Sequence, residues 1–207
     1  MKTISLLLAL VALITPVMAD PPDFRPLFNG KDLTGWKGRG YIVEDGAIVS
    51  TTKGNNLRTE ETFTNYILEF EFKLQSGSNN GLGIHYPGEG DGAYTGMELQ
   101  ILDNTSPKYA KLREYQYHGS LYTLQAAKRE GLKPVGEWNH QRVTVNGPIV
   151  TVVLNGTEIL NANLNELAKA RPKHKGVLRR SGHIAFLGHR SIVAFRNIRI
   201  ADVKQAK

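Results

Sequence analysis

The sequence predicts an all-β protein, a two-sheet antiparallel β-sandwich. Apolar and polar residues alternate over several short stretches, as they do in strands that bury one face. Residue pairs that favour tight turns, such as Asn155-Gly156, separate these stretches. Only residues 164–169 have a helical pattern, and that segment is short.

The predicted strands follow in order along the chain, and a Glu-Asp-Gly-Ala turn at residues 44–47 precedes them. They cover residues 66–74, 81–86, 97–103, three strands between 142 and 160 linked by Asn146-Gly147 and Asn155-Gly156, 183–187 and 192–203. Within residues 81–86, the alternation turns Leu82, Ile84 and Tyr86 to one side. It turns His85 to the opposite side.

The first 19 residues are expected to form a secretory signal peptide. Lys2 provides a positive start, residues 4–14 are apolar, and Val17-Met18-Ala19 fits a small-residue cleavage site. The apolar run is short for a membrane span. We therefore expect cleavage after Ala19, a periplasmic or extracellular location, no integral membrane segment in the mature chain, and a single domain over residues 20–207.

Composition narrows the functional classes. The chain has 26 Lys and Arg against 19 Asp and Glu, a net charge of +7, and it has no cysteine for disulfides. Nucleic acid is not expected as a partner, because aromatic residues do not interleave with the basic ones. Basic residues gather between positions 169 and 180. This segment is interpreted as a solvated loop or as a rim that touches an anionic substrate or the cell envelope.

Residues 97–103 carry the most informative pattern. Apolar residues at 97, 99 and 101 are expected in the core, whereas Glu98 and Gln100 face the other way. The pair is either a site or the wet face of an ordinary sheet. Asp103 would share the face of Glu98 only if a bulge lay between them.

The spacing Glu98-x-Gln100-x-x-Asp103 is similar to the Glu-x-Asp-x-x-Glu pattern of laminarinase and lichenase sandwich glycosidases. Here, however, the middle acid is an amide. A retaining glycosidase needs two carboxyl groups about 5–5.5 Å apart. The altered pattern disfavours an endo-glucanase that acts on unoxidised β-glucan.

Seven short motifs follow one another along the chain, and their order and spacing are informative. They lie at residues 27–36 (opening Leu27-Phe28-Asn29-Gly30 and ending Gly35-Trp36), 43–46, 97–103, 117–122, 134–139, 154–156 and 195–200. In this respect the chain resembles the 3-keto-disaccharide hydrolase domain family, whose fold is a concanavalin A-like jelly roll.

The resemblance implies action on glycosides already oxidised to a ketone at carbon 3. Such a ketone acidifies the hydrogen at carbon 2, so that a base can remove it and the glycosidic oxygen can leave. Water then adds to give the keto-sugar. The reaction needs one base, one donor to the developing enolate and one acid for the leaving oxygen.

With that chemistry in view, Glu98 or His118 is the expected base or acid, and Gln100 would orient the substrate or donate to one of its oxygens. Asp103 would position the histidine or bind a hydroxyl group. Arg58 would stabilise the enolate, and His85 would share the polar face with Glu98. The remaining candidates for substrate binding are Tyr122, Lys128, Lys133, Trp138 and His189. The first three belong to residues 104–137, an excursion too long for an ordinary sandwich loop.

The six histidines show no metal-ligand spacing, so no metal residue is assigned and the cofactor is unknown. The sequence leaves open whether a divalent cation polarises the ketone. The expected partner is a carbohydrate, namely the oxidised glycoside. The alternative is a non-catalytic, lectin-like carbohydrate-binding module, because fold alone does not determine function.

Overall fold

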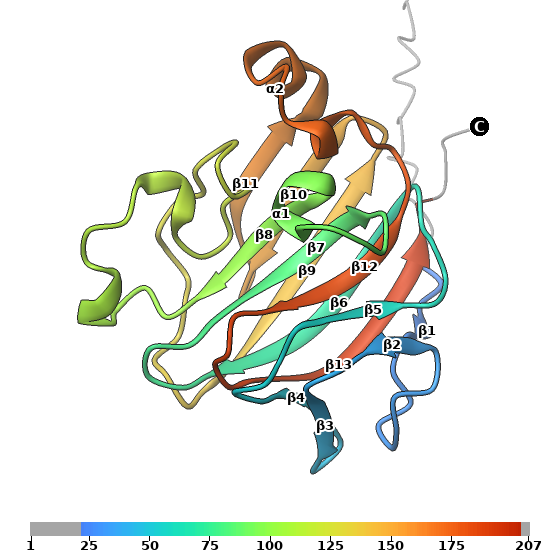
Figure 1. The fold of residues 1–207 in the computed structure, drawn as a ribbon, viewed down its shortest axis with the longest axis vertical. Helices are drawn as coiled ribbons and strands as arrows, with labels where there is room; N and C mark the ends of the chain where they lie inside the picture. The colour runs from blue at the N-terminus through green and yellow to red at the C-terminus, as the bar shows by residue number, and fades with distance from the viewer. Residues whose placement is uncertain (1–21, 204–207) are drawn as a thin grey trace, which may run out of the picture.

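The computed structural model describes residues 22–203, so the expected signal peptide lies outside the described residues. Thirteen strands form two antiparallel sheets that stack as a sandwich, which confirms the predicted fold class (Figure 1). Among the described residues, none of the helices has both the length and the apolar character needed to cross a bilayer.

The larger sheet has eight strands. Seven of them run in the order β11-β10-β9-β6-β13-β4-β3, and β1 pairs with β13. Their bounds are β1 Arg25–Pro26, β3 Tyr41–Glu44, β4 Ala47–Ser50, β6 Tyr66–Leu74, β9 Trp138–Asn146, β10 Ile149–Leu154, β11 Thr157–Asn163 and β13 Val193–Asp202.

The smaller sheet has five strands in the order β2-β5-β12-β7-β8. Their bounds are β2 Trp36–Gly38, β5 Asn56–Thr59, β7 Asn79–Tyr86, β8 Met97–Leu102 and β12 His183–Gly188. The helices are short: α1 Gly92–Thr95, α2 Leu164–Ala170, and the 3-10 turns η1 Pro107–Tyr109, η2 Glu114–Gln116 and η3 Lys175–Leu178. The predicted helix at residues 164–169 corresponds to α2.

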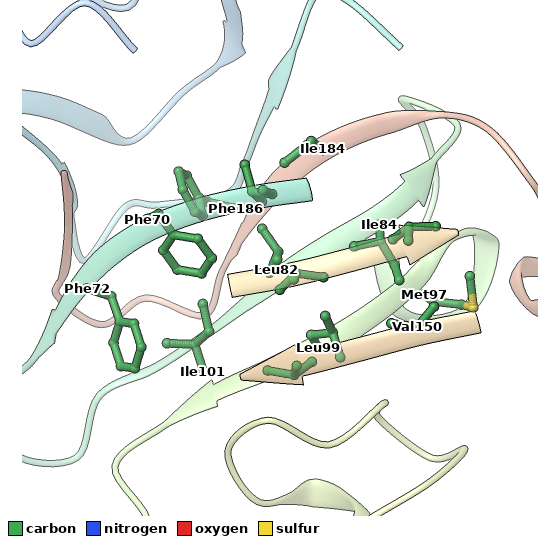
Figure 2. Close-up of a cluster of buried hydrophobic side chains, with 14 of the residues drawn as sticks. Phe70, Phe72, Leu82, Ile84, Met97, Leu99, Ile101, Val150, Ile184 and Phe186 are labelled. Carbon is green, nitrogen blue, oxygen red and sulfur yellow. The ribbon is translucent and has the colours of Figure 1, made fainter. Parts of the chain in front are cut away.

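The hydrophobic core fills the space between the sheets. Phe186 of β12 stacks on Phe195 of β13 with ring centroids 3.8 Å apart. Met97, Leu99 and Ile101 of β8 are fully buried in the same core (Figure 2). The predicted inward face of this strand is therefore confirmed, and the residues between these positions must point out of the sandwich.

Two predicted hairpin turns are found as expected. Asp45-Gly46 joins β3 to β4 and Asn155-Gly156 joins β10 to β11, with positive φ at all four residues, as type I′ turns require. The third turn differs by one residue. Asn146 pairs with Ile149, so the connection is Gly147-Pro148.

The predicted inward position of Tyr86 is wrong. His85 has a φ of 51°, and the register of β7 against β12 shifts at this position. This bulge reverses the alternation at the end of the strand. Tyr86 consequently packs on the outer face of the sheet with Ala185 and Leu187, whereas Leu82 and Ile84 remain in the core.

Strand β8 is the edge of the five-stranded sheet, and the excursion at residues 104–137 covers its free side (Figure 1). The backbone N–H of Gln100 donates to Ser120 O at 3.0 Å, and that of Tyr122 donates to Glu98 O at 2.8 Å. The backbone N–H of Gly119 also donates to Gln100 O, at 2.8 Å. These bonds hold the excursion beside the outward side chains of β8.

Candidate functional site

A cavity of about 480 Å³ lies on the outer face of the five-stranded sheet. Its base is formed by outward side chains of the strands, and its sides by the loop around α1 and by the excursion. The main lining side chains are Asn56, Asn79, Glu98, Gln100 and Leu187 from the sheet, Asp91 and Tyr94 near α1, Tyr109, Leu112, Gln116 and Tyr122 from the excursion, and His189 after β12.

Glu98 and His189 form an acid–imidazole pair in this cavity. His189 Nε2 lies 3.3 Å from Glu98 Oε1, although the two residues are 91 positions apart in the chain. The Glu98 side chain is only 3% exposed, whereas that of His189 is 47% exposed. The hydrogen bond to the carboxylate raises the pKa of His189 above its usual value, against the opposing effect of burial. The pair can therefore accept one proton and donate another.

A glycine on the neighbouring strand makes room for the Glu98 side chain. Gly81 of β7 lies opposite Gln100, and Glu98 leans over it. A Cβ atom at Gly81 would lie 2.6 Å from the carboxyl carbon of Glu98. Any larger residue at position 81 would therefore displace the carboxylate.

Amide side chains provide further polar groups beside Glu98. Gln100 Nε2 donates to Asn79 Oδ1 at 3.2 Å. Gln100 Oε1 is buried and has no hydrogen-bond partner among the described residues. On the excursion, Gln116 Nε2 donates to the Tyr122 hydroxyl at 3.1 Å.

Among residues 22–203, the charged residues that line the cavity are Glu98, Asp91 and His189, and none is a lysine or arginine. Asp91 is already engaged, because its Oδ1 accepts from Ala93 N–H and caps α1. One paired carboxylate among amides and tyrosines suits a neutral, polyhydroxylated ligand. Within residues 22–203, no group of three or more His, Cys, Asp or Glu residues could hold a metal ion.

Four of the predicted site residues line this cavity together: Glu98, Gln100, Tyr122 and His189. Arg58 lies on the same face of the sheet, two residues along β5 from Asn56. It lines an adjoining groove with Tyr86 and Gly90, and its guanidinium lies 3.4 Å from His183 Nε2.

His118 does not line the cavity, so the prediction that it acts there as base or acid is wrong. Its side chain turns between the sheets, where the ring centroid lies 5.0 Å from that of Phe72. The residue is 2% exposed, and neither ring nitrogen has a hydrogen-bond partner among the described residues. Burial lowers the pKa of His118 to about 4, so the ring is neutral at pH 7.

The buried His118 predicts acid sensitivity. Its folded pKa of about 4 lies below the ordinary value of 6.5, so the unfolded chain binds the proton more readily. Stability from this residue should be fully present above pH 6.5 and decline by about 3 kcal/mol as the pH falls to 4. Urea unfolding across this range should show the decline. In a His118→Gln variant, the free energy of unfolding should depend less steeply on pH. An unchanged pH dependence would contradict the burial of His118 as a neutral ring.

Asp103 and His85 also lie away from the cavity. Asp103 follows the end of β8 and organises a turn, since its carboxylate accepts from Gly77 N–H at 2.9 Å and from Thr105 N–H at 3.0 Å. Its expected role beside a histidine is thus wrong. His85 is 1% exposed at the β7 bulge, with its Nε2 3.4 Å from Thr64 O. The bulge removes it from the face shared by Glu98.

Lys128, Lys133 and Trp138 do not line the cavity either. The Trp138 ring lies on the outer face of the eight-stranded sheet, beneath Lys73 and Arg196. Lys133 Nζ donates to Trp138 O at 3.0 Å, and Lys128 Nζ lies 3.9 Å from the Glu130 carboxylate. The length of the excursion indicated a functional segment, but only part of it borders the cavity.

Several lining residues were not predicted from the sequence, namely Asn56, Asn79, Tyr94 and Gln116, and neither was Gly81, which makes room for Glu98. One signal was present in the sequence. Gly81 and Gly83 occupy alternate positions of one strand, which leaves part of one face without side chains. When such glycines lie beside a strand that carries an acidic residue, the acidic side chain can extend over the neighbouring strand.

Comparisons with known proteins agree with the fold. A 3-keto-disaccharide hydrolase of Bacteroides thetaiotaomicron is 29% identical over 234 residues, covering 89% of this chain and 79% of that protein. A crystal structure of a candidate glycosyl hydrolase from Parabacteroides distasonis superposes with a TM-score of 0.79 at 27% identity, covering 87% of this chain and 94% of the other.

A Bacillus subtilis protein of unknown function with a galectin-like fold superposes with a TM-score of 0.58 at 13% identity. This match covers 88% of this chain and 96% of that one, and it bears on the fold alone. The hydrolase relatives support a carbohydrate-active hydrolase. Residues 23–201 match the family described as the 3-keto-alpha-glucoside-1,2-lyase-like domain. The chain therefore belongs to the 3-keto-alpha-glucoside-1,2-lyase-like domain family.

Proposed function

We propose that this protein cleaves glycosides whose carbon 3 has been oxidised to a ketone, and that it acts outside the cytoplasm after export. The buried Glu98 carboxylate, paired with His189 in a cavity that suits a neutral sugar, is the observation that carries this proposal. The name of the Bacteroides relative supports the substrate class.

In the proposed mechanism, the Glu98 carboxylate takes the proton from carbon 2, which the neighbouring ketone has made acidic. The carbon 1–oxygen bond then breaks as the double bond between carbons 1 and 2 forms. Protonated His189 gives its proton to the departing oxygen. Water next adds across the double bond: neutral His189 takes a proton from the water, the resulting hydroxide bonds to carbon 1, and protonated Glu98 returns a proton to carbon 2.

This route fits the residues better than direct glycoside hydrolysis. A retaining glycosidase needs a second carboxyl group as nucleophile, about 5–5.5 Å from the first. Gln100 holds an amide two positions after Glu98, and Asp91 is occupied in capping α1. Elimination beside a ketone needs no such second acid, and Gln100 and Asn79 can orient the sugar hydroxyls.

The experiment is turnover of a panel of 3-keto-glycosides by the purified protein, compared with the unoxidised parent glycosides. We expect cleavage of the keto forms only. When the reaction is run in deuterated water, the proton at carbon 2 of the sugar should be exchanged for deuterium. The same assays in chelator report on an exchangeable metal. Binding without any cleavage would favour the lectin-like alternative, and cleavage of unoxidised β-glucan would favour an endo-glucanase.

A further inference from the structure

A second cavity of about 510 Å³ adjoins the first, and it differs from it in chemistry. Its lining residues are Tyr94, Tyr115, Thr123, Leu124, Ala170, Arg171, Pro172, Lys173 and His174. Tyr94 lines both cavities, so they share this residue as a border. A substrate that occupied both cavities would have to extend past Tyr94.

The second cavity is built from aromatic and basic side chains. Tyr94 is 48% exposed, and Tyr115 and Leu124 add apolar surface beside it. Arg171 and Lys173 supply positive charge, and neither has an ion-pair partner among residues 22–203. The first cavity shows the reverse, because the described residues that line it include the acids Asp91 and Glu98 but no lysine or arginine.

His174 fixes this arrangement. Its Nδ1 accepts from Val177 N–H at 3.2 Å, so its Nε2 carries the proton and donates to Ala93 O at 3.0 Å. The imidazole ring also packs against Tyr94, with ring centroids 5.8 Å apart. The segment after α2 is thereby joined to α1, and the two sides of the second cavity are held together. Because the His174 ring carries only one proton, it is neutral. The positive charge in this cavity therefore comes from Arg171 and Lys173.

We propose that the second cavity holds the leaving group of the substrate, and that the preferred leaving group is an aromatic ring with an anionic substituent. This inference rests on the proposed function, because the sugar must occupy the first cavity. The ring would pack on Tyr94, and the anion would pair with Arg171 and Lys173. A larger cavity beyond His189, with Arg39, Lys53 and Arg190, has cations but lacks an exposed aromatic face.

The test uses two probes of matched shape, 4-carboxyphenyl glucoside and 4-carbamoylphenyl glucoside, in both anomers and without oxidation. Titration calorimetry on the full chain at low salt should show roughly three- to ten-fold tighter binding of the carboxylate. The preference should shrink as salt is added. Arg171→Gln combined with Lys173→Gln should abolish it, while Tyr94→Leu should weaken both probes alike.

Lys169→Gln serves as the matched control, because Lys169 lies on α2 in the same basic segment but does not line the cavity. It should keep the full preference. The proposal is overturned if wild type binds neither probe, if the double variant keeps the preference, or if only Lys53→Gln removes it.

Separate turnover of methyl 3-keto-glucoside distinguishes the two proposals. Cleavage without the carboxylate preference leaves the proposed function standing and rejects the leaving-group site. The preference without cleavage of any 3-keto-glycoside rejects the proposed function, and the second cavity then stands as a site for acidic aryl glucosides.

Discussion

Glu98→Gln should reduce turnover of 3-keto-glycosides by about 10²- to 10⁴-fold, the usual contribution of a general acid or base. Gln has the shape of Glu but cannot take the proton from carbon 2. The side chain is 3% exposed, so water cannot readily replace it. Initial rates on a 3-keto-glycoside, at saturating substrate, measure the loss.

Binding and titration separate a catalytic role from a structural one. The unoxidised glycoside should bind the Glu98→Gln variant about as well as wild type. The pKa of His189, followed by NMR, should fall towards its ordinary value because its hydrogen-bonded carboxylate is gone. Glu130→Gln, a change to an exposed acid outside the cavity, is the control. A rate within two-fold of wild type in the Glu98→Gln variant would overturn the mechanism.

Gly81→Ala should cost about 10²-fold in turnover through a single added methyl group. The new Cβ would lie 2.6 Å from the Glu98 carboxyl carbon, so the carboxylate must move away from His189. A displacement of about 1 Å at a reacting group can reduce the rate by this amount. Gly81 has no positive φ, so alanine fits its backbone and the fold should be retained.

The control for this variant is Gly83→Ala on the same strand. Gly83 lies opposite Glu98 in the register, but the nearest atoms to its added methyl belong to Ala185 and Leu187, at 3.3 Å, and not to the Glu98 carboxylate. Thermal unfolding should show that both variants are folded, and only Gly81→Ala should shift the NMR titration of His189. Equal losses of activity in the two variants would show that Glu98 placement is not the cause.

Much of the fold follows from period-two patterns. The alternation in residues 97–102 predicted which side chains of β8 enter the core, and the Asp45-Gly46 and Asn155-Gly156 turns fixed two hairpins. Tyr86 could not be placed in this way. A bulge at His85 depends on how β7 meets β12, which is a tertiary property that one strand does not encode.

The site was only partly visible in the sequence, for two physical reasons. Glu98 and His189 meet across β7 and β12 from positions 91 residues apart, and no local spacing reports such a contact. His118 lies in an excursion without a regular period, so its direction depends on the space left beside Phe72. A histidine in a polar, aromatic loop resembles a site residue even when it fills the core.

The backbone bonds between β8 and residues 119–122 have a consequence for self-association. A strand at the edge of a sheet offers unpaired N–H and C=O groups, and another copy of the chain can pair with them. Here the excursion occupies that edge at Glu98 and Gln100. The segment that borders the cavity therefore also blocks the edge of β8 against pairing with another chain, so the same few hydrogen bonds close the sheet edge and hold one side of the cavity.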